Sequence, residues 1–241
     1  MGYGVKLEVW GPYASFNRPE MKVERASYDV LTPSAARGIL EAIYWKPEMR
    51  WVIDRIHVLA PIRFTHVRRN EIDQVIPEQN VVGAIRGSPA RLALFVEEHR
   101  QQRAAMILCN VRYGIEAHVE VLRTNDAGPE AQDHPEAKHL AMFKRRAAKG
   151  QYFHHPYLGC REFPAHFRLL GDDERFPPPP QELLGDRDLG FILWDVVFTP
   201  DARGPFVESN GGQRLRAEPR FFRARMRNGV IEVPRLQDTR G

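Results

Sequence analysis

Two side chains stand where their chemistry would be available to a ligand. His118 alternates with apolar residues in the run 115–121, so we expect it on the solvent-facing side of a strand. An imidazole has a reference pKa near about 6.5 and can donate or accept a proton near neutrality. Tyr44 ends an apolar helical pattern shortly before Pro47, where its hydroxyl could orient a substrate oxygen or assist proton transfer. Tyr44 and His118 are therefore the candidate acid–base residues.

Each of these residues also has an ordinary structural interpretation. A histidine between Glu116 and Glu120 is typical of a solvated strand, and the two carboxylates disfavour a polyanion beside it. Tyr44 can equally be an aromatic residue that packs over the end of a helix. Positive charge for a reaction at this place would come from Lys46 or Arg112, if the fold brings either near.

The charged residues suggest an anionic ligand. Lysine and arginine number 35 against 31 acids, and 29 of these cations are arginine, whose planar fork suits phosphate. Basic ends flank an acidic stretch at 171–188, which favours a polarised surface. Any one cation is more often a solvated charge, whereas a cluster would indicate a binding surface. The candidate nucleic-acid-binding residues are Lys22, Arg25, Arg37, Lys46, Arg68, Arg69, Arg103 and Arg161.

Several other kinds of site are not expected. Cys109 and Cys160 are too few for a disulfide framework and lack metal-ligand spacing, so we interpret them as packed thiols. His154 and His155 are adjacent, point to opposite sides of an extended chain and have no spaced partner, so we predict no metal and no other cofactor. No run approaches the roughly 18 apolar residues of a membrane span. We therefore expect a cytoplasmic protein with no membrane partner.

A mixture of helices and strands must position the candidate residues. Helical spacing begins after Thr32, a favourable N-cap, with Pro33 at the first helical position, and ends near Tyr44 because Pro47 forbids continuation. A second helix is expected from residue 133 to Gly150, with a basic last turn. The runs with strand patterns are 5–9, 51–59, 62–67, 104–109, 113–122, 163–170, 189–198, 221–226 and 230–233.

The order of these elements predicts the fold class. Residues 104–122 are expected to form a hairpin, and residues 68–102 a polar, irregular insertion. Strand, helix, strand, strand, helix, strand is the order of an α+β ferredoxin-like (RRM-like) domain, here with an inserted hairpin, which we assign to residues 1–170. The proline run 177–180 is a stiff spacer, and residues 171–241 should form a small C-terminal antiparallel β-sheet domain.

Three local runs together resemble a known family. They are 16–28, which contains Arg18-Pro19-Glu20-Met21-Lys22; 32–47, which ends in Tyr44-Trp45-Lys46-Pro47; and Leu158-Gly159-Cys160-Arg161-Glu162-Phe163. In this order and spacing they resemble the Cas-five family of CRISPR subtype I-C (Dvulg), within the RAMP superfamily. The likeness continues through 100–103, 115–120 and 226–234, so it covers nearly the whole chain.

The resemblance implies an activity and a site. Members of the family bind CRISPR repeat RNA, cut it without a metal, and stay on the 5′ handle of the guide RNA with the other subunits of a type I-C surveillance complex. The family's catalytic tyrosine and histidine fall on Tyr44 and His118, whereas Glu116 and Ala117 stand where a lysine is expected. Three functions stay open: an endoribonuclease that forms a 2′,3′-cyclic phosphate, a non-catalytic scaffold that caps the 5′ handle, and a module that binds duplex DNA.

Overall fold

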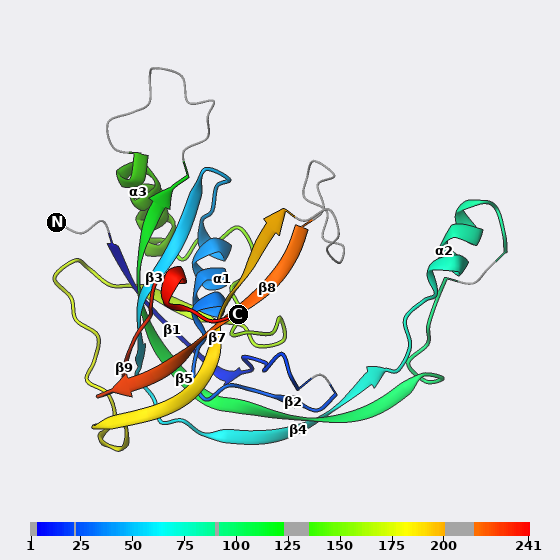
Figure 1. The fold of residues 1–241 in the computed structure, drawn as a ribbon, viewed down its shortest axis with the longest axis horizontal. Helices are drawn as coiled ribbons and strands as arrows, with labels where there is room; N and C mark the ends of the chain where they lie inside the picture. The colour runs from blue at the N-terminus through cyan, green and yellow to red at the C-terminus, as the bar shows by residue number, and fades with distance from the viewer. Residues whose placement is uncertain (1–3, 22, 90–91, 123–134, 201–214) are drawn as a thin grey trace.

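The protein is a mixed α/β structure dominated by one large sheet. A computed structural model describes residues 4–21, 23–89, 92–122, 135–200 and 215–241 (Figure 1), so the candidate binding residue Lys22 lies outside the described residues. No helix within those ranges has the length and apolar character needed to cross a bilayer. The strands of the main sheet, in spatial order, are β6 (His166–Leu169), β1 (Gly4–Ala14), β5 (Arg100–Val121), β3 (Met49–Val58), β9 (Val230–Glu232), β8 (Leu215–Arg227) and β7 (Asp186–Pro200).

Helix α1 (Pro33–Ile43) forms where the sequence predicts it. The Thr32 hydroxyl accepts a hydrogen bond from the backbone N–H of Ala35 at 3.3 Å, which satisfies a donor that the first helical turn leaves free. The helix ends when Tyr44 adopts an extended backbone. The capping residue and the apolar spacing therefore fix the position of Tyr44 relative to the sheet.

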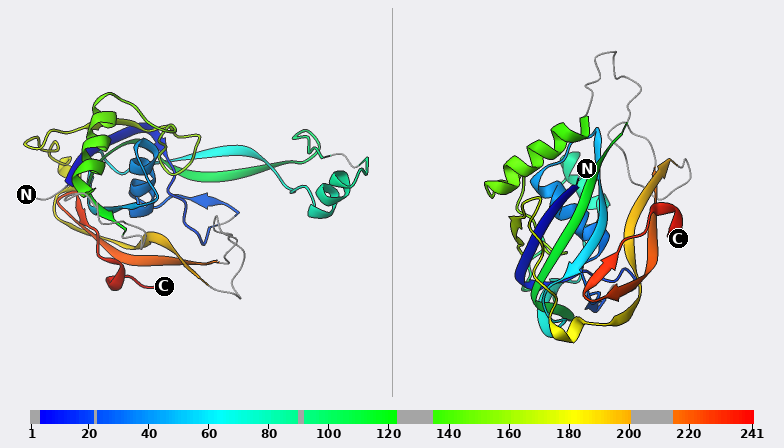
Figure 2. Two further views of the ribbon diagram at one scale, coloured as in Figure 1. Left: turned by 90° about the horizontal axis from the view of Figure 1, so that it is seen from above. Right: turned by 90° about the vertical axis from the view of Figure 1, so that its left-hand side faces the viewer.

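The central strands have two different faces. The strands β6, β1, β5 and β3 are antiparallel neighbours, and the alternate residues Ile115, Ala117 and Val119 of β5 are buried. Helices α1 and α3 (Pro135–Ala148) cover this side, which we call the helix face. Figure 2 shows α1 between α3 and the C-terminal strands. The opposite side, which we call the outer face, carries the polar residues of the same strands.

The structure corrects two predictions about residues 62–122. The expected hairpin at 104–122 is wrong, because β5 is a single strand that runs through Asn110, whose φ is positive at 52°. The expected irregular insertion is also wrong, because β4 (Phe64–Ile72) pairs with the first half of β5, and α2 (Glu78–Ile85) follows it. Together they form an arm that extends from the body (Figure 1). Its side chains are largely solvated, so the apolar periodicity that marks a buried strand is missing.

The C-terminal strands join the same sheet and core. Strand β9 pairs with β3, placing Ile231 opposite Ile56, and both side chains are fully buried in one hydrophobic cluster. Arg37 of α1 donates two hydrogen bonds to the Asp195 carboxylate of β7, at 2.6 and 2.9 Å. The elements before and after residue 170 thus share one sheet and one hydrophobic core. Whether they are two folding units, as the sequence predicts, stays a prediction.

Candidate functional site

His118 lies on the outer face of the sheet. It pairs with Gly4 of β1 and Val52 of β3, and its side chain is 38% exposed. Its Nδ1 atom is 2.9 Å from both carboxylate oxygens of Asp54. An ionised carboxylate can only accept hydrogen bonds, so Nδ1 carries the hydrogen and Nε2 is the nitrogen available for proton transfer. The site therefore has an oriented imidazole.

The surroundings of His118 are rich in carboxylates. Glu120 lies 3.9 Å from Nε2 and forms an ion pair with Arg50. Glu116 pairs with Arg55 at 3.3 Å. These acids would repel an approaching phosphate, which the two arginines would attract. RNA could bind here only if Arg50 and Arg55 released Glu120 and Glu116 and paired with a phosphate instead.

Tyr44 belongs to a separate, buried group on the helix face. Its hydroxyl lies 3.0 Å from Nδ1 of His139 in α3, and its carbonyl accepts a hydrogen bond from the Trp51 indole at 2.9 Å. The Arg146 guanidinium lies over the phenol ring, 5.2 Å from its centre, and Glu48 lies 3.9 Å from His139 Nε2. Burial raises the pKa of the Tyr44 hydroxyl and lowers the pKa of His139. At neutral pH the phenol therefore donates to a neutral imidazole.

The structure does not bring the two candidate acid–base residues together. Trp51 pairs with Val119, and its ring lies 4.7 Å from Phe143 of α3, on the helix face. Neighbouring residues of a strand point to opposite faces, so His118 is on the outer face, while Tyr44 is bonded to Trp51 on the helix face. Both are near the same end of the sheet. The two residues could act on one phosphate only if the RNA strand passed over this end of the sheet, from the outer face to the helix face.

Three of the candidate binding arginines do converge. Arg25 of β2 (Arg25–Ala26), Arg69 of β4 and Arg103 of β5 lie 3.2, 3.7 and 3.6 Å from the Glu71 carboxylate. Arg69 also forms an ion pair with Glu162. We call Arg25, Arg69 and Arg103 the basic cluster. Two carboxylates do not neutralise three guanidinium groups, so the base of the arm keeps positive charge for a phosphate.

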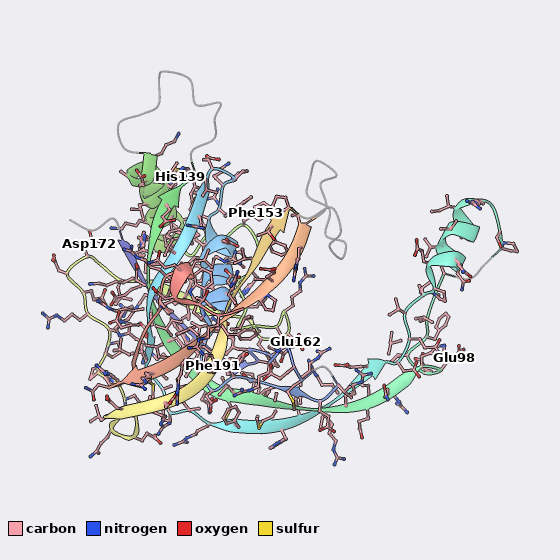
Figure 3. All side chains as sticks on the ribbon, in the orientation of Figure 1. Glu98, His139, Phe153, Glu162, Asp172 and Phe191 are labelled. Atoms are coloured by element: carbon pink, nitrogen blue, oxygen red, sulfur yellow. The ribbon has the colours of Figure 1, made fainter. Side chains whose placement is uncertain are left out.

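The other candidate cations are scattered. Arg68 is exposed and precedes Arg69 of the basic cluster. Arg161 is exposed and precedes Glu162, the ion-pair partner of Arg69. Lys46 is exposed two residues after Tyr44. The guanidinium of Arg37 forms ion pairs with the Asp195 and Glu41 carboxylates, so it is not free to bind an RNA phosphate. Figure 3 shows Glu162, beside the basic cluster, well apart from His139, beside Tyr44. The binding and acid–base candidates thus occupy different parts of the surface.

Several residues of these groups were not predicted from the sequence, among them His139, Arg146 and Asp54. His139 and Arg146 lie on one face of α3, seven residues apart, and the helical spacing of Phe143 between them was the available signal. Asp54 reaches His118 where the register of β3 and β5 shifts between Ile53 and Arg55. A bulge of this kind has no reliable sequence signature.

Mild acidification is expected to destabilise the protein through His139. Its pKa is lowered in the folded state, so the unfolded chain binds the proton more readily, and stability falls as pH drops below about 6.5, the unfolded value. The measurement is the urea midpoint between pH 8 and 5 for the wild type and His139→Gln. The variant should be less stable at pH 8 and lose less stability on acidification. Parallel pH curves for the two proteins would contradict the assignment.

The match to a family model along nearly the whole chain defines a CRISPR-associated protein. The model, described as CRISPR-associated protein (Cas_Cas5), matches residues 4–234. The relative named CRISPR pre-crRNA endoribonuclease Cas5d from Mannheimia succiniciproducens is 51% identical, over 97% of this chain and 96% of its own. The relative of the same name from Thermus thermophilus is 44% identical, over 95% and 91%. The chain belongs to the Cas5 family, which confirms the resemblance found from its motifs.

A solved structure supports the fold. The crystal structure described as a CRISPR-associated protein aligns with a TM-score of 0.62, over 98% of this chain and 94% of its own. The two sequences are 21% identical, so this likeness concerns the fold alone. It agrees with the mixed architecture and the dominant antiparallel sheet described above.

Proposed function

We propose that this protein is an endoribonuclease that cuts precursor CRISPR RNA within the repeat and stays on the 5′ handle as a subunit of a cytoplasmic surveillance complex. The observation that carries the proposal is the 51% identity, across 97% of the chain, to a relative named CRISPR pre-crRNA endoribonuclease Cas5d. Such identity along the whole length means that the two chains share one fold.

The topology supports an RNA-handling module of the ferredoxin-like class. The elements β1, α1, β3, β5, α3 and β6 follow one another in the chain, and their strands lie in the order β6-β1-β5-β3. Two helices on one face of four antiparallel strands is the arrangement of that fold. The basic cluster, with Arg68, Arg161 and Lys46, is the proposed surface for the RNA backbone.

The proposed reaction needs no metal. The 2′-oxygen loses its proton, attacks the neighbouring phosphorus, and the bond from phosphorus to the 5′-oxygen breaks as that oxygen gains a proton. The products are a 2′,3′-cyclic phosphate and a 5′-hydroxyl. We propose His118 Nε2 as one proton-transfer group, held in orientation by Asp54. Tyr44 is the second candidate, and its hydroxyl is oriented by the hydrogen bond to His139.

Purified protein is expected to cut repeat RNA in excess EDTA, measured on a denaturing gel. A single 2′-deoxy substitution at the scissile nucleotide should abolish cleavage, because the attacking oxygen is removed. The same substitution one nucleotide away is the matched control and should leave cleavage intact. Tight binding with no product would favour the alternative, a scaffold that caps the 5′ handle. Displacement of the RNA by equimolar duplex DNA would favour a DNA-binding module.

A further inference from the structure

A surface cavity lies at the C-terminal end of α3, beside the Tyr44 group. It has a volume of about 520 Å³ and is lined by Arg146, Gly150, Gln151, Tyr152 and Phe153. The backbone of the lining residues Gly150 and Gln151 is held by hydrogen bonds: their N–H groups donate to the carbonyls of Ala147 and Arg146 at 3.1 and 2.9 Å. The cavity is therefore a fixed feature of the surface and contains neither His118 nor the basic cluster.

Two aromatic rings of this segment are exposed although their backbone is held. Phe153 is 83% exposed, yet its N–H donates to the Ala42 carbonyl of α1 at 2.8 Å. Tyr152 is 45% exposed and lies 4.9 Å from the His155 ring. An exposed phenyl ring contributes little to folding, since its apolar surface stays in water. Two neighbouring rings held in this way on an ordered loop are available to stack on a planar ligand.

The charge at the cavity favours an anionic occupant. Among the described residues Arg146 has no carboxylate partner: it donates to the Ile43 carbonyl at 3.1 Å and lies over the Tyr44 ring. None of the lining residues is acidic, and Lys149 adds a cation next to Gly150 at the end of the helix. A guanidinium oriented by a carbonyl and an aromatic face, with no counter-ion, is prepared to bind phosphate.

We propose that this cavity is a subsite for one nucleotide of single-stranded RNA, whose base stacks on Phe153 and whose phosphate pairs with Arg146. An aromatic ring beside an unpaired arginine is the combination that binds single strands without a fixed sequence. The inference rests on the proposed function, because it takes the substrate to be RNA. It also places that strand beside Tyr44, since Arg146 contacts both the cavity and the phenol ring.

The test measures binding of a fluorescein-labelled repeat RNA that carries the single 2′-deoxy nucleotide. Phe153→Leu keeps the apolar volume but removes the aromatic face, and it should weaken binding about 5- to 150-fold, the range for loss of one stacked base. Phe153→Tyr keeps the face and should bind like the wild type. Arg146→Gln should reduce the slope of log affinity against log salt by about 0.7, the value for one phosphate of a single strand.

Phe191→Leu is the matched control, because Phe191 is 48% exposed on β7 and lies apart from Phe153 (Figure 3). Its RNA affinity should equal that of the wild type. A scan with abasic nucleotides should find one position where removing the base weakens the wild type but has no further effect on Phe153→Leu. Wild-type affinity in Phe153→Leu, with lost co-purification of partner subunits, would overturn the proposal in favour of a protein interface. If the wild type binds the RNA but does not cut it, the proposed nuclease activity is wrong. The binding measurements on Phe153→Leu and Arg146→Gln still test the subsite.

Discussion

Replacing His118 by alanine is expected to lower the rate of repeat cleavage by about 10²- to 10⁴-fold, the usual contribution of one positioned acid or base. The imidazole is exposed on the outer face, and its Nδ1 is fixed by Asp54 at 2.9 Å. Because Nδ1 is held by Asp54, Nε2 is free to exchange a proton with a ribose or leaving-group oxygen. The measurement is the single-turnover rate at saturating protein, which separates the chemical step from binding.

Two variants make this prediction specific. His66→Ala removes another exposed histidine, on β4, and should cleave at the wild-type rate. Asp54→Asn keeps the shape beside His118 but removes the charge that orients the imidazole, so it should lose less activity than His118→Ala. Full cleavage by His118→Ala would exclude this residue from catalysis and leave the Tyr44 group as the candidate site.

The arrangement of the two faces can be tested in the same assay. Tyr44→Phe removes the hydroxyl that bonds to His139 and keeps the ring under Arg146. If Tyr44 and His118 act as one unit, the double variant should be no slower than the slower single variant. If the fold-loss in cleavage rate of the double variant equals the product of the two single losses, the residues act independently. That result is expected for rings on opposite sides of the sheet.

Gly159→Ala is expected to be strongly destabilising, with a loss above about 4 kcal/mol or failure to fold. Gly159 has φ +85°, and an added Cβ would lie 2.0 Å from the Ser15 carbonyl oxygen and 2.7 Å from its carbon. Both are backbone atoms, and Ser15 is held by a hydrogen bond from its N–H to the Leu158 carbonyl at 3.0 Å. Relief of the clash would therefore separate the segment after β1 from the loop before β6.

Gly150→Ala is the control that separates the clash from the cost of a left-handed backbone. Gly150 has φ +64°, and an added Cβ would meet no atom within 4 Å. It should lose only about 1 to 2 kcal/mol, the cost of that conformation for an L-residue. Urea unfolding followed by circular dichroism measures both variants. Equal losses would show that the loop moves to accept the Cβ.

Elements with complete local signals were predicted from the sequence and are confirmed. Helix α1 has its capping threonine, its proline at the first position and a proline soon after its end. The turn between β8 and β9 uses Asn228 and Gly229, both with positive φ, as the Asn-Gly pair predicts. In each case the residues that determine the conformation are adjacent in the chain.

Features that depend on distant residues were not predictable in the same way. Strand β5 continues through Asn110 because β4 pairs with one half of it and β1 and β3 with the other. The basic cluster forms because β2 is placed beside β5. Likewise, His118 was correctly predicted to point outward, but its contact with Asp54 depends on a register shift between two strands.

The pairing of β9 with β3 has a consequence for shortened versions of the protein. Removing everything after residue 170 would leave the backbone groups of residues 55–57 without β9 and remove the apolar residues Ile192, Phe222 and Ile231 from the core. A sheet edge and an apolar surface exposed together are a template for intermolecular association. The N-terminal part alone should therefore aggregate in expression trials, however complete its set of strands and helices.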